Sequence, residues 1–176
     1  MLFTDRSIWT MVHGIGLGGG ALMGLAAALF YLYAAHSAEG TVRPATEARP
    51  FAAVMIVTAT TLWLAVLVGT YIVFPTYRAT PPSGVTDLTQ FPRALLLASP
   101  DTAWLHAFAM ESKEHMPWIA SMLATAVAFV AVRYRSGLLV SARLRSMAFG
   151  LLAISFALVA FVSLLGVFVN KVAPLQ

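Results

Sequence analysis

The stretch "SMAFGLLAISFALVAFVSLLGVFVN", Ser146 to Asn170, decides the fold because it contains no charged side chain. A helix needs about 20 consecutive apolar residues to cross the roughly 30 Å of hydrocarbon in a bilayer. The stretch is long enough to do so, and it therefore predicts a transmembrane helix.

Three further uncharged windows precede it, over residues 7–38, 50–77 and 115–132. The chain is 60% hydrophobic and 10% charged, whereas about 25% of the residues of an average soluble domain are charged. We therefore expect an all-α, integral membrane four-helix bundle with helices near residues 8–35, 52–75, 103–133 and 146–170. The longest connection is too short for another folded unit, so residues 1–176 are expected to form a single transmembrane domain.

The orientation follows from the segment "RYRSGLLVSARLR", residues 133–145, which carries four arginines and no acid. Loops rich in arginine and lysine stay on the cytoplasmic side. An even number of helices then places both termini outside the cytoplasm, and we expect an integral protein of the bacterial inner membrane. The first apolar run exceeds the roughly 7–15 residues of a signal-peptide core, so we expect it to remain as an anchor.

The charged residues of "MESKEHMPWIA", Met110 to Ala120, adjoin the third apolar window. Counting about 1.5 Å per residue from the arginine loop places Glu114 and His115 just inside the outer edge of the hydrocarbon. The same count on the first helix places His13 at that depth and His36 at the opposite, inner end. Ser99 is expected to cap the third helix, and Pro117 to bend it beside His115.

The face of each histidine is estimated from the helical repeat. His106 and His115 are nine positions apart, about 900° at 100° per residue, so they lie on opposite faces of an ideal helix. We expect the deeper one, His115, to face the bundle, with Glu111 as its i,i+4 neighbour. On the first helix, pairs such as Gly16 with Gly20 have the small-xxx-small spacing that lets helices approach closely, and the same smooth surface would admit a flat macrocycle.

Two histidines at one depth on two helices suit the axial ligation of one b-type haem near the outer face. In this interpretation His13 and His115 bind the iron, while His106 and His36 are less favoured ligands. The other expected cofactor contacts are Gly16 and Gly20 beside the ring, Glu111 or Glu114 holding a histidine in orientation, and Tyr77, Arg78 and Lys113 near the propionates. The chain has no cysteine, which excludes attachment of a c-type haem through a CxxCH motif.

The helix count and the pair His13 and His115 resemble the four-helix membrane b-type cytochrome subunits of respiratory complexes. The resemblance implies an electron-transfer subunit rather than a self-sufficient enzyme. Familiar members with two haems carry two histidines on each of two helices, whereas His36 has no histidine partner at its depth here.

Several alternatives remain open. A quinone pocket at the outer surface is compatible with a haem, with His106 or Glu114 as proton acceptor. A zinc, copper or di-iron site would use Glu111, Glu114, His115 and His13, but the second and fourth helices lack the carboxylates of a di-iron bundle. The main alternative is a cofactor-free accessory or assembly subunit of a larger membrane complex. The expected partners are lipid and other membrane subunits or a redox protein at the outer face, and no nucleic acid.

Overall fold

The computed structural model describes residues 4–37 and 48–175, whose regular elements are all helical. Four of its helices are long and apolar enough to cross a membrane: Asp5–Ala35, Ala48–Tyr77, Pro100–Tyr134 and Ala142–Val172. The predicted number and order of long apolar helices are confirmed. Each helix extends a few residues beyond the predicted bounds, because backbone hydrogen bonding continues where the hydrocarbon-length window ends.

Three of the long helices contain a π-helical segment, written η. The first consists of α1 (Asp5–Met11), η1 (Val12–Gly19) and α2 (Gly20–Ser37). The second consists of α3 (Ala48–Val68), η3 (Gly69–Val73) and α4 (Phe74–Tyr77). The third consists of α6 (Pro100–Trp104), η4 (Leu105–Met110) and α7 (Glu111–Tyr134), and the fourth is α9 (Ala142–Val172). Two short helices, α5 (Pro92–Leu97) and α8 (Ser136–Val140), lie in the connections.

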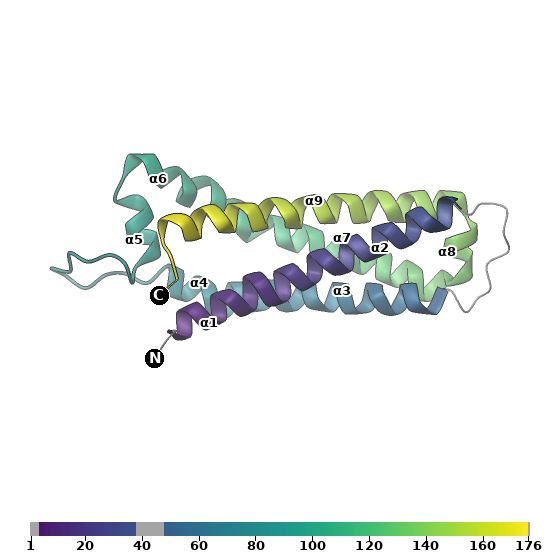
Figure 1. Ribbon diagram of the computed structural model, residues 1–176, viewed down its shortest axis with the longest axis horizontal. Helices are drawn as coiled ribbons and strands as arrows, with labels where there is room; N and C mark the ends of the chain where they lie inside the picture. The colour runs from purple at the N-terminus through teal and green to yellow at the C-terminus, as the bar shows by residue number, and fades with distance from the viewer. Residues whose placement is uncertain (1–3, 38–47, 176) are drawn as a thin grey trace.

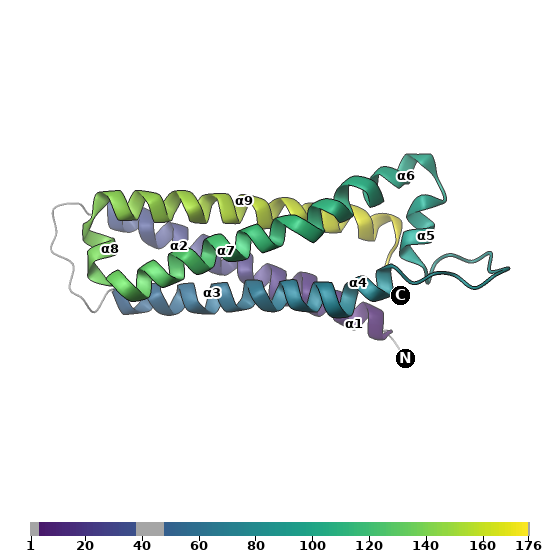
Figure 2. The same cartoon turned by 180° about the vertical axis from the view of Figure 1, so that it is seen from behind.

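The long helices form a ring, because contacts join α2 to α3, α3 to α7, α7 to α9 and α9 back to α2. Both chain termini lie at one end of the bundle together with α4, α5 and α6 (Figure 1), and we call this the terminal end. The opposite end, which we call the arginine end, holds α8 and the arginines that flank it (Figure 2). The chain therefore runs up, down, up and down between the two ends.

The helix after the long connection starts where the sequence predicts. The hydroxyl of Ser99 accepts a hydrogen bond from the backbone N–H of Asp101 at 3.3 Å, and Pro100 occupies the first helical position. Both features favour initiation of a helix, since proline lacks only an N–H that the first turn leaves unpaired anyway.

Large apolar side chains cover the outside of the bundle. Ile15, Met23 and Phe30 expose 75%, 73% and 72% of their surface, and Phe129 exposes 67%. A water-soluble helix keeps its apolar residues on one face, whereas these helices are apolar inside and outside. This distribution is compatible with an integral membrane protein, whose outer surface contacts lipid chains.

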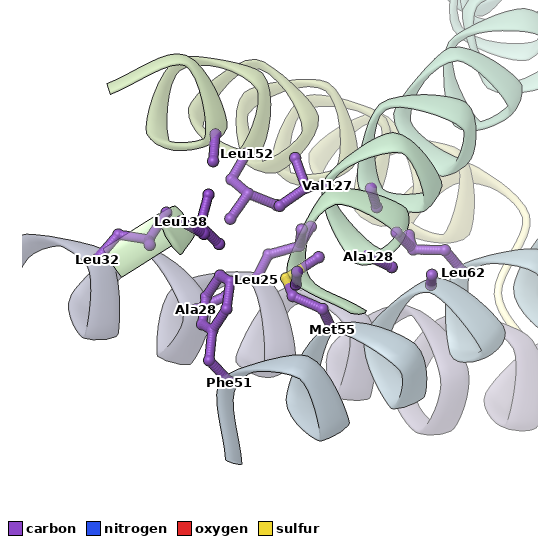
Figure 3. Close-up of a cluster of buried hydrophobic side chains, with 14 of the residues drawn as sticks. Leu25, Ala28, Leu32, Phe51, Met55, Leu62, Val127, Ala128, Leu138 and Leu152 are labelled. Carbon is purple, nitrogen blue, oxygen red and sulfur yellow. The ribbon is translucent and has the colours of Figure 1, made fainter. Parts of the chain in front are cut away.

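Small side chains dominate where the helices meet. Ala21, Ala28, Ala120 and Ala124 are completely buried, and larger side chains such as Leu25, Phe51, Met55 and Leu152 fill the spaces between them (Figure 3). Tyr31 stacks on Phe51 with ring centroids 5.3 Å apart, which joins α2 to α3.

Two side-chain hydrogen bonds also connect neighbouring helices. The buried hydroxyl of Ser155 in α9 donates to the carbonyl of Ala120 in α7 at 3.0 Å. The indole N–H of Trp63 in α3 donates to the hydroxyl of Thr125 in α7 at 3.0 Å. Such bonds add modestly to helix association in an apolar medium, about 0.6 kcal/mol on average.

The glycines of the first helix differ in what they contact. A Cβ atom added to Gly24 would collide with the side chain of Thr58 in α3, and one added to Gly20 would lie 3.8 Å from Cγ2 of Thr61. A Cβ on Gly14 or Gly16 would meet no heavy atom of the described residues within 4 Å. The predicted close helix approach therefore applies to the later glycines of the series.

We expect Gly24→Ala to lower the free energy of unfolding by about 1–3 kcal/mol, because the new methyl group overpacks the contact with Thr58. Gly16→Ala is the matched control: its methyl group points into open space, and alanine favours a helix over glycine by about 0.5–1 kcal/mol. Thermal unfolding in detergent compares the two variants. Equal loss of stability in both would contradict the assigned contact.

Candidate functional site at the terminal end

The three π-helical segments among residues 4–37 and 48–175 lie in the half of the bundle nearer the terminal end. His13 belongs to η1, Gly69 to η3 and His106 to η4. A π-helical turn widens the backbone ring, and such turns are frequent at functional sites. The hydrophobic pattern of these helices is uniform across the π-helical segments and therefore does not predict them.

The imidazole of His13 packs directly on Gly69 of the second helix. A Cβ added to Gly69 would lie 2.7 Å from Cε1 of His13 and 3.2 Å from its Nδ1, so only glycine leaves room for the ring. The backbone carbonyl of Ala65 is also within reach of the ring. Nδ1 is buried and has no hydrogen-bond partner among the residues described.

The side chain of Lys113 points into the bundle from the third helix. Its Nζ lies 3.1 Å from the position that a Cβ on Gly166 of α9 would take. Lys113 also acts electrostatically on His13, so the two groups lie within electrostatic range of each other. An unpaired charge in an apolar bundle costs several kcal/mol, and within residues 4–37 and 48–175 no ion pair of Lys113 is found. Polar groups held in this way usually mark a functional site.

A second set of polar side chains connects three segments at the terminal end. The hydroxyl of Tyr77 lies 2.9 Å from Nδ1 of His106, and the Nε–H of Arg93, in α5, donates to Nε2 of His106 at 3.4 Å. Because Nε2 accepts, we assign the proton of a neutral ring to Nδ1, which donates to the oxygen of Tyr77. The hydroxyl hydrogen of Tyr77 then remains free to donate elsewhere.

The charged residues around this group balance one another. Arg78 and Arg93, together with Glu114, act electrostatically on both Tyr77 and His106. Glu111 acts on His106 as well, and the guanidinium of Arg78 lies 5.1 Å from the centre of the Phe74 ring. Tyr77, Arg78, Glu111 and Glu114 thus lie at one end of the bundle, as predicted from the sequence, but around His106.

The expected orientation of His115 is wrong. Its side chain is exposed, on the outward stripe of the third helix that also contains Phe108, Glu111, Ile119 and Met122. The small residues Ser112, Ala120, Ser121 and Ala124 form the packing face instead, since they allow the closest helix approach. His106 is the histidine that faces its neighbours.

Glu111 is the neighbour of His115, but through its backbone. The ring Nδ1–H of His115 donates to the carbonyl oxygen of Glu111 at 2.8 Å, which leaves Nε2 free. The expected i,i+4 proximity is confirmed, whereas the contact uses the main chain rather than the carboxylate.

The remaining predicted site residues are dispersed. Gly16 faces open space and Gly20 packs near Thr61, so neither contributes a wall to the site around His13. His36 belongs to α2, and its side chain lies outside the described residues. In the part of the chain that the structure describes, no three His, Asp or Glu side chains are placed to hold a metal ion together, and His13 and His115 point in different directions.

Comparison with protein-family models, with curated proteins and with solved structures finds no match to this chain.

We expect Lys113→Met to raise the free energy of unfolding of the ligand-free protein by about 1–4 kcal/mol, because it replaces an uncompensated charge with an apolar side chain of similar length. Lys171→Met removes an exposed charge from the same end of the bundle, and we expect it to change stability little. Thermal unfolding in detergent measures both. A loss of stability in Lys113→Met would mean that its charge already has a compensating partner.

Proposed function

We propose that this protein is an integral membrane subunit of an electron-transfer assembly, and that its terminal end binds the headgroup of a quinone. One observation carries the proposal: the unpaired Lys113 lies within electrostatic range of His13, whose Nδ1 is buried without a partner among the described residues. The proposal includes insertion of the four helices into a membrane with the arginine end on the cytoplasmic side and both termini outside.

This site contains the polar groups that can bind the headgroup of a quinone. Its carbonyl oxygens accept hydrogen bonds, which the ammonium of Lys113 can donate, and the unprotonated Nδ1 of His13 can accept the hydroxyl hydrogen of the quinol. Its isoprenoid tail would lie along the apolar outer surfaces of the helices. When an electron reaches the quinone, negative charge develops on its oxygens, and a fixed cation in a medium of low dielectric constant stabilises that charge.

The group formed by Tyr77, His106 and Arg93 supports proton exchange at the same end. Oxidation of a quinol releases two electrons and two protons, and reduction of a quinone takes up the same number. Glu114 lies within electrostatic range of both Tyr77 and His106. In this proposal these groups accept the two protons and pass them towards the terminal end. The electrons would pass to or from a one-electron carrier in a partner subunit.

A b-type haem is the second candidate, favoured by the surroundings of the two imidazoles. A ligating histidine often holds one ring nitrogen against a backbone carbonyl and binds the metal through the other. His115 has this arrangement with Glu111, with Nε2 left free, and His13 lies by the carbonyl of Ala65 with Nδ1 unpartnered. The fit is partial, because ligation by both rings requires the outward-facing His115 to turn towards the bundle.

The test is a titration of the purified protein in lipid nanodiscs with a short-chain ubiquinone or menaquinone analogue. Quenching of tryptophan fluorescence reports binding, since Trp118 follows Lys113 on the same helix. We expect saturable quenching and at least a tenfold weaker Kd, about 1.4 kcal/mol, in both Lys113→Met and His13→Leu. Lys171→Met is the control and should bind like the unmodified protein.

An absorption spectrum of the same preparation separates the alternatives. A reduced b-type α-band that disappears in both His13→Ala and His115→Ala would replace the quinone proposal with haem ligation. If neither a band nor saturable quenching is found with haem and quinone supplied, the protein is a cofactor-free accessory or assembly subunit.

A further inference from the structure

A groove lies between α3 and α7 at the arginine end, far along the bundle from the polar site. It has a volume of about 360 Å³. It is lined by Ala48, Ala52, Ala53 and Ile56 of α3 and Val132 of α7, together with Arg49 and Arg135. The three alanines of α3 create the hollow, because larger side chains there would fill it.

The rim is strongly basic. Within the described residues neither Arg49 nor Arg135 has an ion-pair partner, and all the acids of those residues lie towards the terminal end, at positions 5, 87, 101, 111 and 114. The same end also carries Arg133, Arg143 and Arg145. The described residues of this end therefore carry positive charge only, which favours binding of an anion beside them.

The backbone of Arg135 is strained. It has φ 45° and ψ −117°, and among the described residues it is the only one besides glycine with a positive φ. Side chains with a Cβ atom disfavour this conformation, and residues held in it often serve a function. Here the turn between α7 and α8 carries an arginine in a conformation that suits glycine, and this arginine lines the groove.

We propose that this groove binds one anionic phospholipid from the membrane leaflet at the arginine end. The phosphate lies between the guanidinium groups of Arg49 and Arg135, which form charge-assisted hydrogen bonds with its oxygens. One acyl chain follows the apolar walls from Arg49 to Ile56, a distance of about 10 Å along the helix axis. Basic pockets between transmembrane helices on the cytoplasmic side commonly bind acidic lipid headgroups in this way.

The apolar walls distinguish a lipid from a free phosphate ion. A phosphate ion would contact only the two arginines, whereas the groove continues past them along apolar side chains. The walls open to the outside of the bundle, where a lipid chain is already present if the helices span a membrane. The inference rests on membrane insertion but is independent of the quinone site.

The test is native mass spectrometry of the full chain, purified in detergent with equal amounts of phosphatidylglycerol and phosphatidylcholine. We expect one phosphatidylglycerol to remain bound per chain. The double variant Arg49→Gln with Arg135→Gln should lose at least tenfold in retained phosphatidylglycerol, and Ile56→Trp should lose it as well by filling the groove without changing the charge. Arg143→Gln removes an exposed charge at the same end and should retain the lipid.

Three outcomes would overturn the proposal. Equal retention of phosphatidylcholine would show that the charge of the headgroup is not recognised. Equal loss in Arg143→Gln would mean that the general charge of this end, rather than the groove, attracts the lipid. Retention by Ile56→Trp would exclude the groove as the binding site.

The variant Arg135→Gly distinguishes the effect of the Arg135 charge on lipid binding from the effect of its backbone strain on stability. Glycine adopts a positive φ freely, so this variant should unfold about 2–4 °C above the unmodified protein in lipid-free detergent. It should nevertheless retain less phosphatidylglycerol. A gain in stability together with unchanged lipid retention would contradict the role assigned to the Arg135 side chain.

Discussion

The close approach of small residues is the constraint on which the rest of this bundle depends. Hydrophobicity cannot determine the packing face of a helix that is apolar on every side. Van der Waals contacts and a few hydrogen bonds determine that face instead. Gly24 meets Thr58 across the first helix pair, and Ser155 hydrogen-bonds to the carbonyl of Ala120 across the last. Once these faces are in contact, every bulky side chain on the other faces is turned outwards.

The same rule explains how polar groups enter an apolar bundle. At Gly24 the missing side chain admits a neighbouring helix, whereas at Gly69 it admits the imidazole of His13 and at Gly166 the ammonium group of Lys113. The helices thus keep their ring arrangement while two polar side chains lie between them. The widened backbone of the π-helical segments occurs in the same half of the molecule, so packing is least regular where the polar residues gather.

Much of the architecture could be predicted from the sequence, and the site only in part. The uncharged windows identified all four helices, and Ser99 followed by Pro100 marked a helix start that the structure confirms. The opposite faces of His106 and His115 also followed from helical geometry. The sequence did not predict which of the two histidines faces inward, because the depth of a residue in the bundle does not determine the rotation of its helix about the axis. The contact between Arg93 and His106 was equally unpredictable, since it depends on how the long connection folds back through α5.

The sequence by itself determined the number of long helices, their order and the segment of residues 133–145 that carries four arginines and no acid, because these properties depend on local composition and length. The tertiary structure decided which side chains face one another: His13 against Gly69, Lys113 against Gly166 and His106 against Tyr77. The reason is that a uniformly apolar helix has almost the same local energy at every rotation about its axis. Contacts with neighbouring helices, made by residues far apart in the chain, select one rotation and thereby place the polar groups.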